Sequence, residues 1–237
     1  MKKTLAPIVL ATVAALIATG APSTVLAAGP TDVHSCGPIT SSGSYVLTKN
    51  VTASGDCFNI SANDVTFDFD GFTAAGDGTG TAMTLDGRGI VVRNGTVRHF
   101  GVGIVIVTHG PGVDLREGSV IERMQVLDMV NFGIGGGFGT VRDSFMAGNG
   151  NTSIALGSGP SLITNNRVVG NQSAGVAAGA GSTVSGNVIS DNNLLPLSNG
   201  LTATCPTLIV NNTIVGQSNN LVTFGVGCVI DHNVIGP

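Results

Sequence analysis

Most of the charged side chains of this chain lie in one stretch, residues 64–143. That stretch holds ten acidic residues and six arginines, whereas residues 144–237 hold only Arg167, Asp191 and Asp231. Carboxylates mixed with arginines can do three kinds of chemistry. They can transfer protons in general acid–base catalysis, hold a divalent cation through carboxylate oxygens, or bind a polar partner through charge-assisted hydrogen bonds. Which of these applies depends on the elements that hold the side chains.

A repeat of about 22 residues must position these side chains. Four segments align around an asparagine: ITNNRVVGN, VSGNVISDN, IVNNTIVGQ and IDHNVIGP. The column contains Asn166, Asn187, Asn212 and Asn233, and it continues backwards through Ser144, Met124, Gly95 and Phe72. Apolar residues lie three positions before it (Phe69, Val92, Ile121, Val141, Ile163, Val184, Ile209 and Ile230) and two positions after it (Ala74, Val97, Val126, Met146, Val168, Ile189, Ile214 and Ile235). A third apolar group contains Ile104, Ile134, Ile154, Val176, Leu201 and Val222.

Each repeat therefore has three short apolar segments separated by Gly, Asn and Ser, which is typical of strands rather than helices. Three strands in roughly 22 residues is too short a period for ankyrin, leucine-rich or propeller repeats. The sequence predicts an all-β fold, a single-stranded right-handed parallel β-helix of about eight coils of ~22 residues, stacked about 4.8 Å apart. The asparagine column should form a ladder of side-chain amides at one bend. Asn149, Asn171, Asn192 and Gln217 form a second polar column.

In this alignment one charged column projects outward, two positions before the asparagines. It contains the candidate catalytic residues Asp70, Arg93, Glu122 and Arg142, and the candidate substrate-binding residues Asp68, Arg123, Asp143 and Arg116 surround it. Arg116 belongs to the one long insertion, residues 110–119. No cofactor is expected except Ca²⁺, which would lie among Asp68, Asp70 and Glu122, because no other column brings carboxylates together.

The charged column has three interpretations. As a structural ladder, opposite charges on neighbouring strands contribute about 0.2–1 kcal/mol per pair. As a shallow groove, the column would contact an acidic or neutral glycan. As an active site, it would perform acid–base chemistry. The chain has no Asp-Asp pair, no Trp and a single Tyr, which lowers the expectation of a sugar-cleaving site.

The N-terminus has the pattern of an export signal. Lys2 and Lys3 precede an apolar run over residues 5–17, and small residues allow cleavage after Ala27. The run is shorter than the roughly 20 residues of a spanning helix, so no membrane insertion is expected. We therefore predict a secreted or periplasmic protein with a signal peptide over 1–27, an N-terminal cap over 28–62 and the β-helix over 63–237. The net charge of −4 offers no basic patch for nucleic acid.

Four cysteines in an exported chain predict two disulfides, for which the sequence alone allows three pairings. Cys36 and Cys57, and likewise Cys205 and Cys228, are separated by about one coil, which favours these two pairs. No C-x-x-C or H-x-x-x-H motif is present, so a zinc site is not expected.

The segment NDVTFDFDG (residues 63–71), followed by VVRNGTVRHFG and the asparagine repeats, resembles the right-handed parallel β-helix proteins of the pectin-lyase-like superfamily. The resemblance covers residues 36–237. That superfamily includes pectate lyases, polygalacturonases, alginate-modifying enzymes, viral tailspikes and adhesins, so the resemblance specifies fold more than activity. Related lyases hold Ca²⁺ with clustered Asp and Glu and use an Arg as base, and related hydrolases use two or three Asp.

These observations lead to one favoured function and two alternatives. The favoured one is a secreted β-helix scaffold that contacts polysaccharide or cell-surface glycan. The first alternative is a small polysaccharide lyase or glycoside hydrolase that uses the charged column. The second is a structural adhesin or fibre module, which predicts end-to-end association. The sequence leaves the oligomeric state open.

Overall fold

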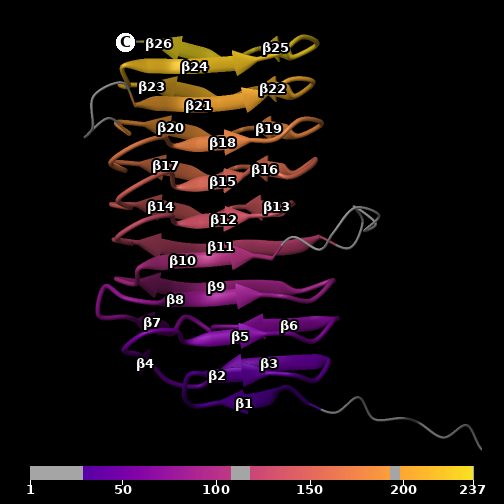
Figure 1. The fold of residues 1–237 in the computed structure, drawn as a ribbon, viewed down its shortest axis with the longest axis vertical. Coiled ribbons are helices and arrows are strands. Elements are labelled where there is room, and N and C mark those ends of the chain that lie inside the picture. Colours follow the sequence, from indigo (N-terminus) through magenta and orange to yellow (C-terminus); the bar gives the residue numbers. More distant parts are fainter. Residues whose placement is uncertain (1–28, 108–117, 193–197, 237) are drawn as a thin grey trace, which may run out of the picture.

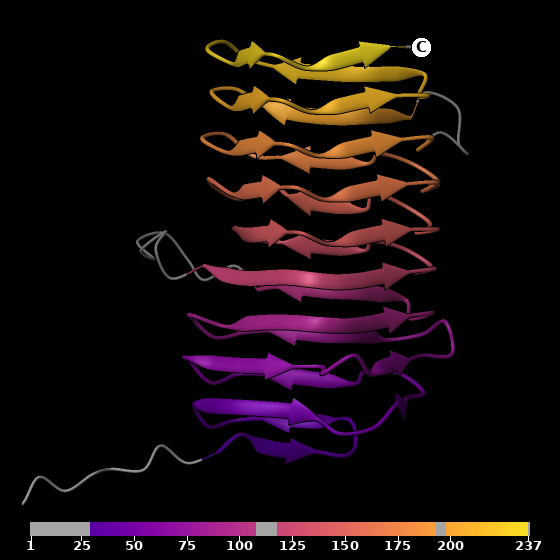
Figure 2. The same cartoon turned by 180° about the vertical axis from the view of Figure 1, so that it is seen from behind.

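The protein is a right-handed parallel β-helix, as the sequence predicts. The computed structural model describes residues 29–107, 118–192 and 198–236, and these contain 26 strands and no helix. The coils stack from β1 (Thr31–Val33) to β26 (Val234–Gly236), with one layer of strands on the near side in Figure 1 and a second layer seen from behind in Figure 2. The predicted signal peptide lies outside the described residues.

One layer is a nine-stranded sheet to which each coil contributes one strand. All neighbours in this sheet pair in parallel, which is the pattern that stacked coils produce. The strands are β2 (Gly37–Ile39), β5 (Phe58–Ile60), β8 (Thr81–Leu85), β10 (Val102–Ile106), β12 (Ile134–Gly136), β15 (Ile154–Leu156), β18 (Val176–Ala178), β21 (Asn199–Thr204) and β24 (Asn219–Phe224).

The other layer is a 17-stranded sheet in which most coils contribute two strands joined by a bend. The strands before the bend are β1, β3 (Gly43–Leu47), β6 (Val65–Asp68), β13 (Gly139–Arg142), β16 (Leu162–Thr164), β19 (Thr183–Ser185), β22 (Leu208–Val210) and β25 (Val229–Asp231). Those after it are β4 (Val51–Thr52), β7 (Thr73–Ala75), β14 (Phe145–Ala147), β17 (Arg167–Val169), β20 (Val188–Ser190), β23 (Thr213–Val215) and β26. β9 (Val91–Arg98) and β11 (Ser119–Leu127) run through the bend as single strands.

The predicted apolar columns line the interior of the solenoid. Ile121, Val141, Ile163, Val184 and Ile209 pair in register from β11 to β22, and each is fully buried. Burial of one such aliphatic side chain per strand contributes about 1.5–3 kcal/mol, and this contribution repeats in every coil.

Two predicted registers are wrong. Phe67, not Phe69, pairs with Val92, because two extra residues lie between β6 and β7. Both phenylalanines are nevertheless fully buried. In the last coil Leu221, not Val222, pairs with Leu201, so the inward column ends one residue earlier than predicted.

The asparagine column forms the predicted ladder inside the bend. Asn166 donates its side-chain N–H to Asn187 Oδ1 over 3.0 Å, and its backbone N–H donates to the same oxygen over 2.9 Å. Asn187 and Asn212 repeat this pattern one coil further on. The second polar column forms the same kind of ladder. The side-chain N–H of Asn149 donates to Asn171 Oδ1, and the side-chain N–H of Asn171 donates to Asn192 Oδ1. These amides satisfy backbone groups that a tight buried bend would otherwise leave unpaired.

The segment predicted as a cap adds strands to the same two sheets. β3 lies between β1 and β6, and β5 lies between β2 and β8, all in parallel register. Phe58, Phe67 and Phe69 fill the interior here, with ring centroids 4.8 to 6.1 Å apart. Three aromatic rings thus replace the Ile and Val side chains that fill the later coils.

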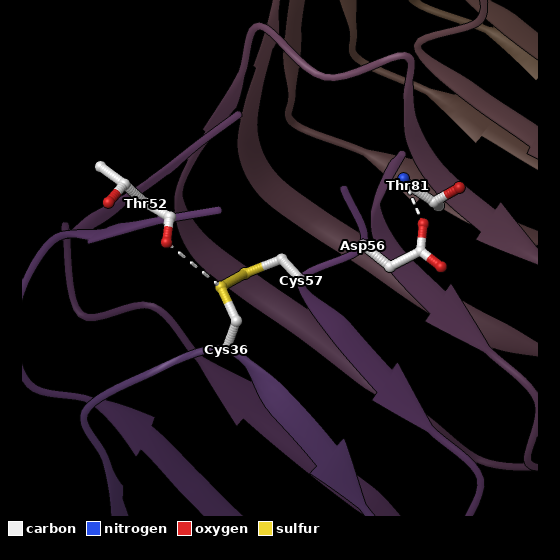
Figure 3. The surroundings of a disulfide bond; sticks show 5 residues. All are labelled: Cys36, Thr52, Asp56, Cys57 and Thr81. Atoms are coloured by element: carbon white, nitrogen blue, oxygen red, sulfur yellow. Dashed lines mark hydrogen bonds between the residues drawn. A yellow bond between two sulfur atoms is a disulfide. The ribbon is translucent and has the colours of Figure 1, made fainter. Parts of the chain in front are cut away.

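Both disulfides join the pairs of cysteines that their spacing in the sequence favoured. The Cα atoms of Cys36 and Cys57 are 4.6 Å apart, and those of Cys205 and Cys228 are 4.8 Å apart. These separations match the spacing of neighbouring strands, about 4.7–4.9 Å, so each bond joins one coil to the next. Figure 3 shows the Cys36–Cys57 bond beside Asp56, whose carboxylate accepts the Thr81 backbone N–H over 2.8 Å.

Candidate functional site

Four charged residues form a column on the outer face of neighbouring strands β6, β9, β11 and β13. Asp68 pairs in register with Arg93, Arg93 with Glu122, and Glu122 with Arg142. Each residue follows an inward-facing apolar residue, and side chains alternate along a strand, so all four project outward. The column alternates in charge sign, negative and positive, over four coils.

Asp68 lies at the N-terminal end of this column and accepts hydrogen bonds from three neighbours. Arg93 Nε donates to Asp68 Oδ2 over 2.8 Å. Asn94 Nδ2 lies 3.1 Å from both carboxylate oxygens, and the Asp70 backbone N–H donates to Oδ1 over 2.9 Å. Both Asp68 oxygens are therefore occupied by donors from its own coil and the next.

These contacts decide the pKa of Asp68. Burial of the carboxylate raises the pKa, but the hydrogen bonds from Asp70, Asn94 and Arg93, with the positive charge of Arg93, outweigh burial. The pKa of Asp68 is therefore held below its ordinary value of 3.8. Asp68 is a stably ionised partner for Arg93 and is poorly suited to donate a proton near neutral pH.

Glu122 is the most buried member of the column, with only 6% of its side chain exposed. Arg123 Nη2 donates to Glu122 Oε1 over 2.6 Å. Arg142 donates to Oε2 through Nε, over 2.9 Å, and also through Nη2. Both Glu122 oxygens therefore accept from guanidinium groups, whereas the two arginines are about half exposed.

Asp70 is not in this column, contrary to the sequence alignment. The two extra residues between β6 and β7 move it to the bend, where it is exposed and has a φ of 48°. Asp68 occupies the position that was assigned to Asp70. Asp143 also lies at the bend, with a φ of 53°, next in the chain to Arg142. Arg116 lies outside the described residues, as do Asp114 and Glu117 of the same insertion.

The three carboxylates suggested for Ca²⁺ are not brought together. The strand that carries Arg93 separates Asp68 from Glu122, and Asp70 lies at the bend. Within residues 29–107, 118–192 and 198–236, no three His, Cys, Asp or Glu side chains form a group that could hold a metal ion. In the same part of the chain, no helix has the length and apolar character needed to cross a membrane.

A shallow depression lies next to the charged column, on the other side of the bend. We call it the Phe145 depression; it is lined by Arg123, Met124, Gln125, Asp143, Ser144, Phe145, Asn165 and Arg167. Gln125, Phe145 and Arg167 pair in register on β11, β14 and β17, so their side chains stand in one outward column. Arg123, Asp143 and Asn165 form the parallel column at the bend, all with positive φ.

The lining of the Phe145 depression includes an aromatic ring with a guanidinium group above it. The Arg167 Cζ atom lies 5.5 Å from the centroid of the Phe145 ring, within the range of a cation–π contact. Sequence reasoning identified Arg123 and Asp143 here but missed Gln125, Phe145, Asn165 and Arg167. A signal was available, because Gln125, Phe145 and Arg167 each lie one position after the asparagine column, in the first outward position after the bend.

Comparisons with known proteins support the fold alone. No protein-family model and no curated protein sequence matches the chain. Among solved structures, the chain is similar to the catalytic unit of a thermostable GH87 alpha-1,3-glucanase from Streptomyces thermodiastaticus, with a TM-score of 0.55 and 20% identity. The match covers 87% of this chain and 47% of the glucanase unit, so the chain spans about half the length of that structure. At the level of fold, this protein is a right-handed parallel β-helix.

Proposed function

We propose that this chain is an exported β-helix protein that binds a polysaccharide at the Phe145 depression without cleaving it. The observation that carries the proposal is the combination of an exposed Arg167 over the Phe145 ring with amide and carboxylate groups on the neighbouring coils. Two disulfides support an extracytoplasmic location, because such bonds persist in oxidising compartments.

The chemistry of the Phe145 depression suits a sugar chain. Gln125 and Asn165 offer both donors and acceptors, Asp143 offers acceptors and Arg123 offers donors, which together match the paired hydroxyl groups of a pyranose ring. The Arg167 guanidinium lies over the Phe145 ring, and its own plane offers a flat surface for the C–H face of the sugar. Coils repeat about every 4.8 Å, close to the length of one sugar unit, so successive sugars can meet equivalent positions on successive coils.

The charged column supports the fold in this proposal and takes no part in catalysis. A general acid or base needs a free position toward the substrate. Both oxygens of Asp68 and both oxygens of Glu122 are occupied by donors from the protein itself. Arg93 also lies between the two carboxylates, where a substrate bond would have to lie. The fold similarity to a glucanase supports the polysaccharide class and carries no assignment of activity.

Binding to a panel of polysaccharides tests the proposal. The panel contains an alpha-1,3-glucan, pectate, alginate and hyaluronate, and binding is measured by affinity electrophoresis with and without Ca²⁺. We expect retardation by at least one member, a loss of more than tenfold in affinity for Arg167→Ala, and no appearance of reducing ends or unsaturated products.

Arg98→Ala is the matched control, because it removes the same type of exposed side chain from β9, outside the depression. Equal losses for Arg98→Ala and Arg167→Ala would show that only general charge matters. Binding by no member of the panel, or product formation from any member, would contradict the proposal.

A further inference from the structure

A second hollow lies at the start of the strands β11, β13 and β16, on the side of the solenoid. We call it the Leu162 notch; its lining includes Val120, Thr140, Pro160 and Leu162. Its volume is about 410 Å³, within the range of roughly 300–1,000 Å³ that is usual for ligand pockets. The proposed polysaccharide site, the Phe145 depression, shares no lining residue with it.

A short turn in one coil creates the Leu162 notch. Only two residues, Gly137 and Phe138, join β12 to β13, whereas five residues join β15 to β16 and four join β18 to β19. The coil of β13 is therefore recessed at this bend, beside the wider turn before β16 (Figure 1). Gly118 on one neighbouring coil and Pro160 on the other line the hollow that remains.

The lining of the Leu162 notch is apolar except for one outward hydroxyl group. Val120, Thr140 and Leu162 pair in register, so their side chains stand in one outward column. Leu162 is 41% exposed, and Val120 and Pro160 are partly exposed. None of the described residues that line the notch is charged. The notch therefore suits an uncharged group that has an apolar part and one hydrogen-bond acceptor.

The Leu162 notch and the Phe145 depression lie on the same three coils. Each coil contributes one outward residue to each hollow, and the two residues are always five positions apart: Val120 and Gln125, Thr140 and Phe145, Leu162 and Arg167. Along the continuous strand β11, five positions correspond to roughly 16 Å. A short run of sugars that lies obliquely across these coils can therefore reach both hollows.

We propose that the Leu162 notch binds an acetyl group of the polysaccharide whose other sugars lie in the Phe145 depression. The acetyl methyl group packs against Val120, Pro160 and Leu162, and the acetyl carbonyl oxygen accepts a hydrogen bond from the Thr140 hydroxyl. A carboxylate would lose its water in the notch without gaining a cation. The inference rests on the proposed function and names its ligand class, an acetylated polysaccharide.

Affinity electrophoresis on matched polysaccharides tests this proposal. Alginate and an alpha-1,3-glucan are used after chemical O-acetylation and again after removal of the acetyl groups by mild alkali. Hyaluronate is used before and after N-deacetylation, so that ester and amide acetyl groups are distinguished. We expect the wild-type protein to bind at least one acetylated form about three- to tenfold more tightly than its deacetylated partner, the effect of one hydrogen bond and a buried methyl group.

Two variants locate that preference in the Leu162 notch. Thr140→Val removes the hydroxyl and keeps the shape of the side chain, and Leu162→Ser removes an apolar wall. Each should reduce the preference to less than about twofold. Leu208→Ser is the matched control, because Leu208 is 39% exposed in the same outward column, two coils beyond Leu162. This control should keep the full preference.

Four outcomes would overturn the proposal. Equal affinity for the acetylated and deacetylated forms, with binding still weakened by Arg167→Ala, would overturn this inference and leave the proposed function intact. Retardation by no form of any polysaccharide would overturn both. A preference that survives Thr140→Val and Leu162→Ser, or that Leu208→Ser removes, would place acetyl recognition elsewhere. A dimer in light scattering that Leu162→Ser dissociates would show that a second copy covers the notch.

Discussion

The coils up to β11 and the coils after it keep their register by different means. In the early coils the interior is filled by large rings, Phe58, Phe67 and Phe69, and the outer face carries the alternating charges of Asp68, Arg93 and Glu122. In the later coils the interior contains Ile and Val, and buried asparagine ladders link each bend to the next.

A close contact explains why the two means do not overlap. Gly95 occupies the asparagine column on β9, and a Cβ there would collide with Phe69. The aromatic cluster therefore leaves no room for an asparagine at this position of β9. Exposed ion pairs contribute little, typically under 1 kcal/mol, whereas a buried polar group that loses its partner costs about 1–3 kcal/mol. The comparison teaches that the later coils depend on their polar ladders much more than the early coils depend on their charges.

Removal of an asparagine from the ladder should have the largest effect. Asn187→Ala takes the acceptor from two N–H groups of Asn166 and the donor from the Ile163 carbonyl, all of them buried. We expect a loss of about 3–5 kcal/mol in the free energy of unfolding, measured by urea denaturation. Asn94→Ala, which removes the hydrogen bonds that Asn94 donates to Asp68 and accepts from Arg123 near the surface, should cost about 1 kcal/mol or less. Equal losses would remove the distinction between the two regions.

A cavity in the later coils should have the next largest effect. Ile163 is fully buried between Val141 and Val184, and stacked coils cannot collapse around a missing side chain. We expect Ile163→Ala to cost about 2–4 kcal/mol by the same denaturation measurement. Thr164→Ala changes the adjacent outward position and should cost under about 0.5 kcal/mol. A loss of less than 0.5 kcal/mol for Ile163→Ala would contradict the register described here.

Changes to the charged column should have a small effect. Arg93 and Arg142 keep much of their surface exposed, so water can replace part of what each substitution removes. Arg93→Ala should cost under about 1 kcal/mol, and high salt should reduce this cost further. Arg142→Ala removes a partner of the buried Glu122 carboxylate and should cost about 1–2 kcal/mol. A loss above 2 kcal/mol for either variant would mean that the column is as important to stability as the asparagine ladders.

Removal of the Asp77 carboxylate, in the early coils, should have the smallest effect on stability. That effect should be visible only at acidic pH. Hydrogen bonds from Thr79 and then Ser54 lower the pKa of Asp77 from 3.8 to about 2. A lowered pKa in the folded state gives a contribution that is present above pH 4 and is lost as the pH falls toward 2. Asp77→Asn should therefore flatten the decline of melting temperature between pH 4 and pH 2. An unchanged slope would show that Asp77 plays no part in acid stability.

The sequence predicted the later coils more accurately than the early ones, for a physical reason. The ladder positions must be asparagine because buried bends need side-chain partners, so Asn166, Asn187 and Asn212 align without ambiguity. In the early coils Phe67 and Phe69 alternate with Asp68 and Asp70. A shift of two residues keeps every side chain on the same face, so the pattern could not distinguish the two registers.

The Phe145 depression was harder to predict than the charged column. Alternating charges form a pattern that can be read along the repeats, and the structure confirms three of its four positions, Arg93, Glu122 and Arg142. Gln125, Phe145 and Arg167 share no chemical type, and only their register on neighbouring strands brings them together. Their common position after the bend can be read from the repeats, but residues that differ in type do not mark that position as a site in a single sequence.

Polysaccharide affinity of two arginine variants tests the central claim, that the charged column supports the fold while the Phe145 depression binds. Arg93→Ala and Arg167→Ala are compared by affinity electrophoresis on the polysaccharide that retards the wild-type protein most. The account predicts near-wild-type binding for Arg93→Ala and a loss of more than tenfold for Arg167→Ala, with both proteins folded by circular dichroism. Loss of binding in Arg93→Ala with retention in Arg167→Ala would contradict it and would place the site on the charged column.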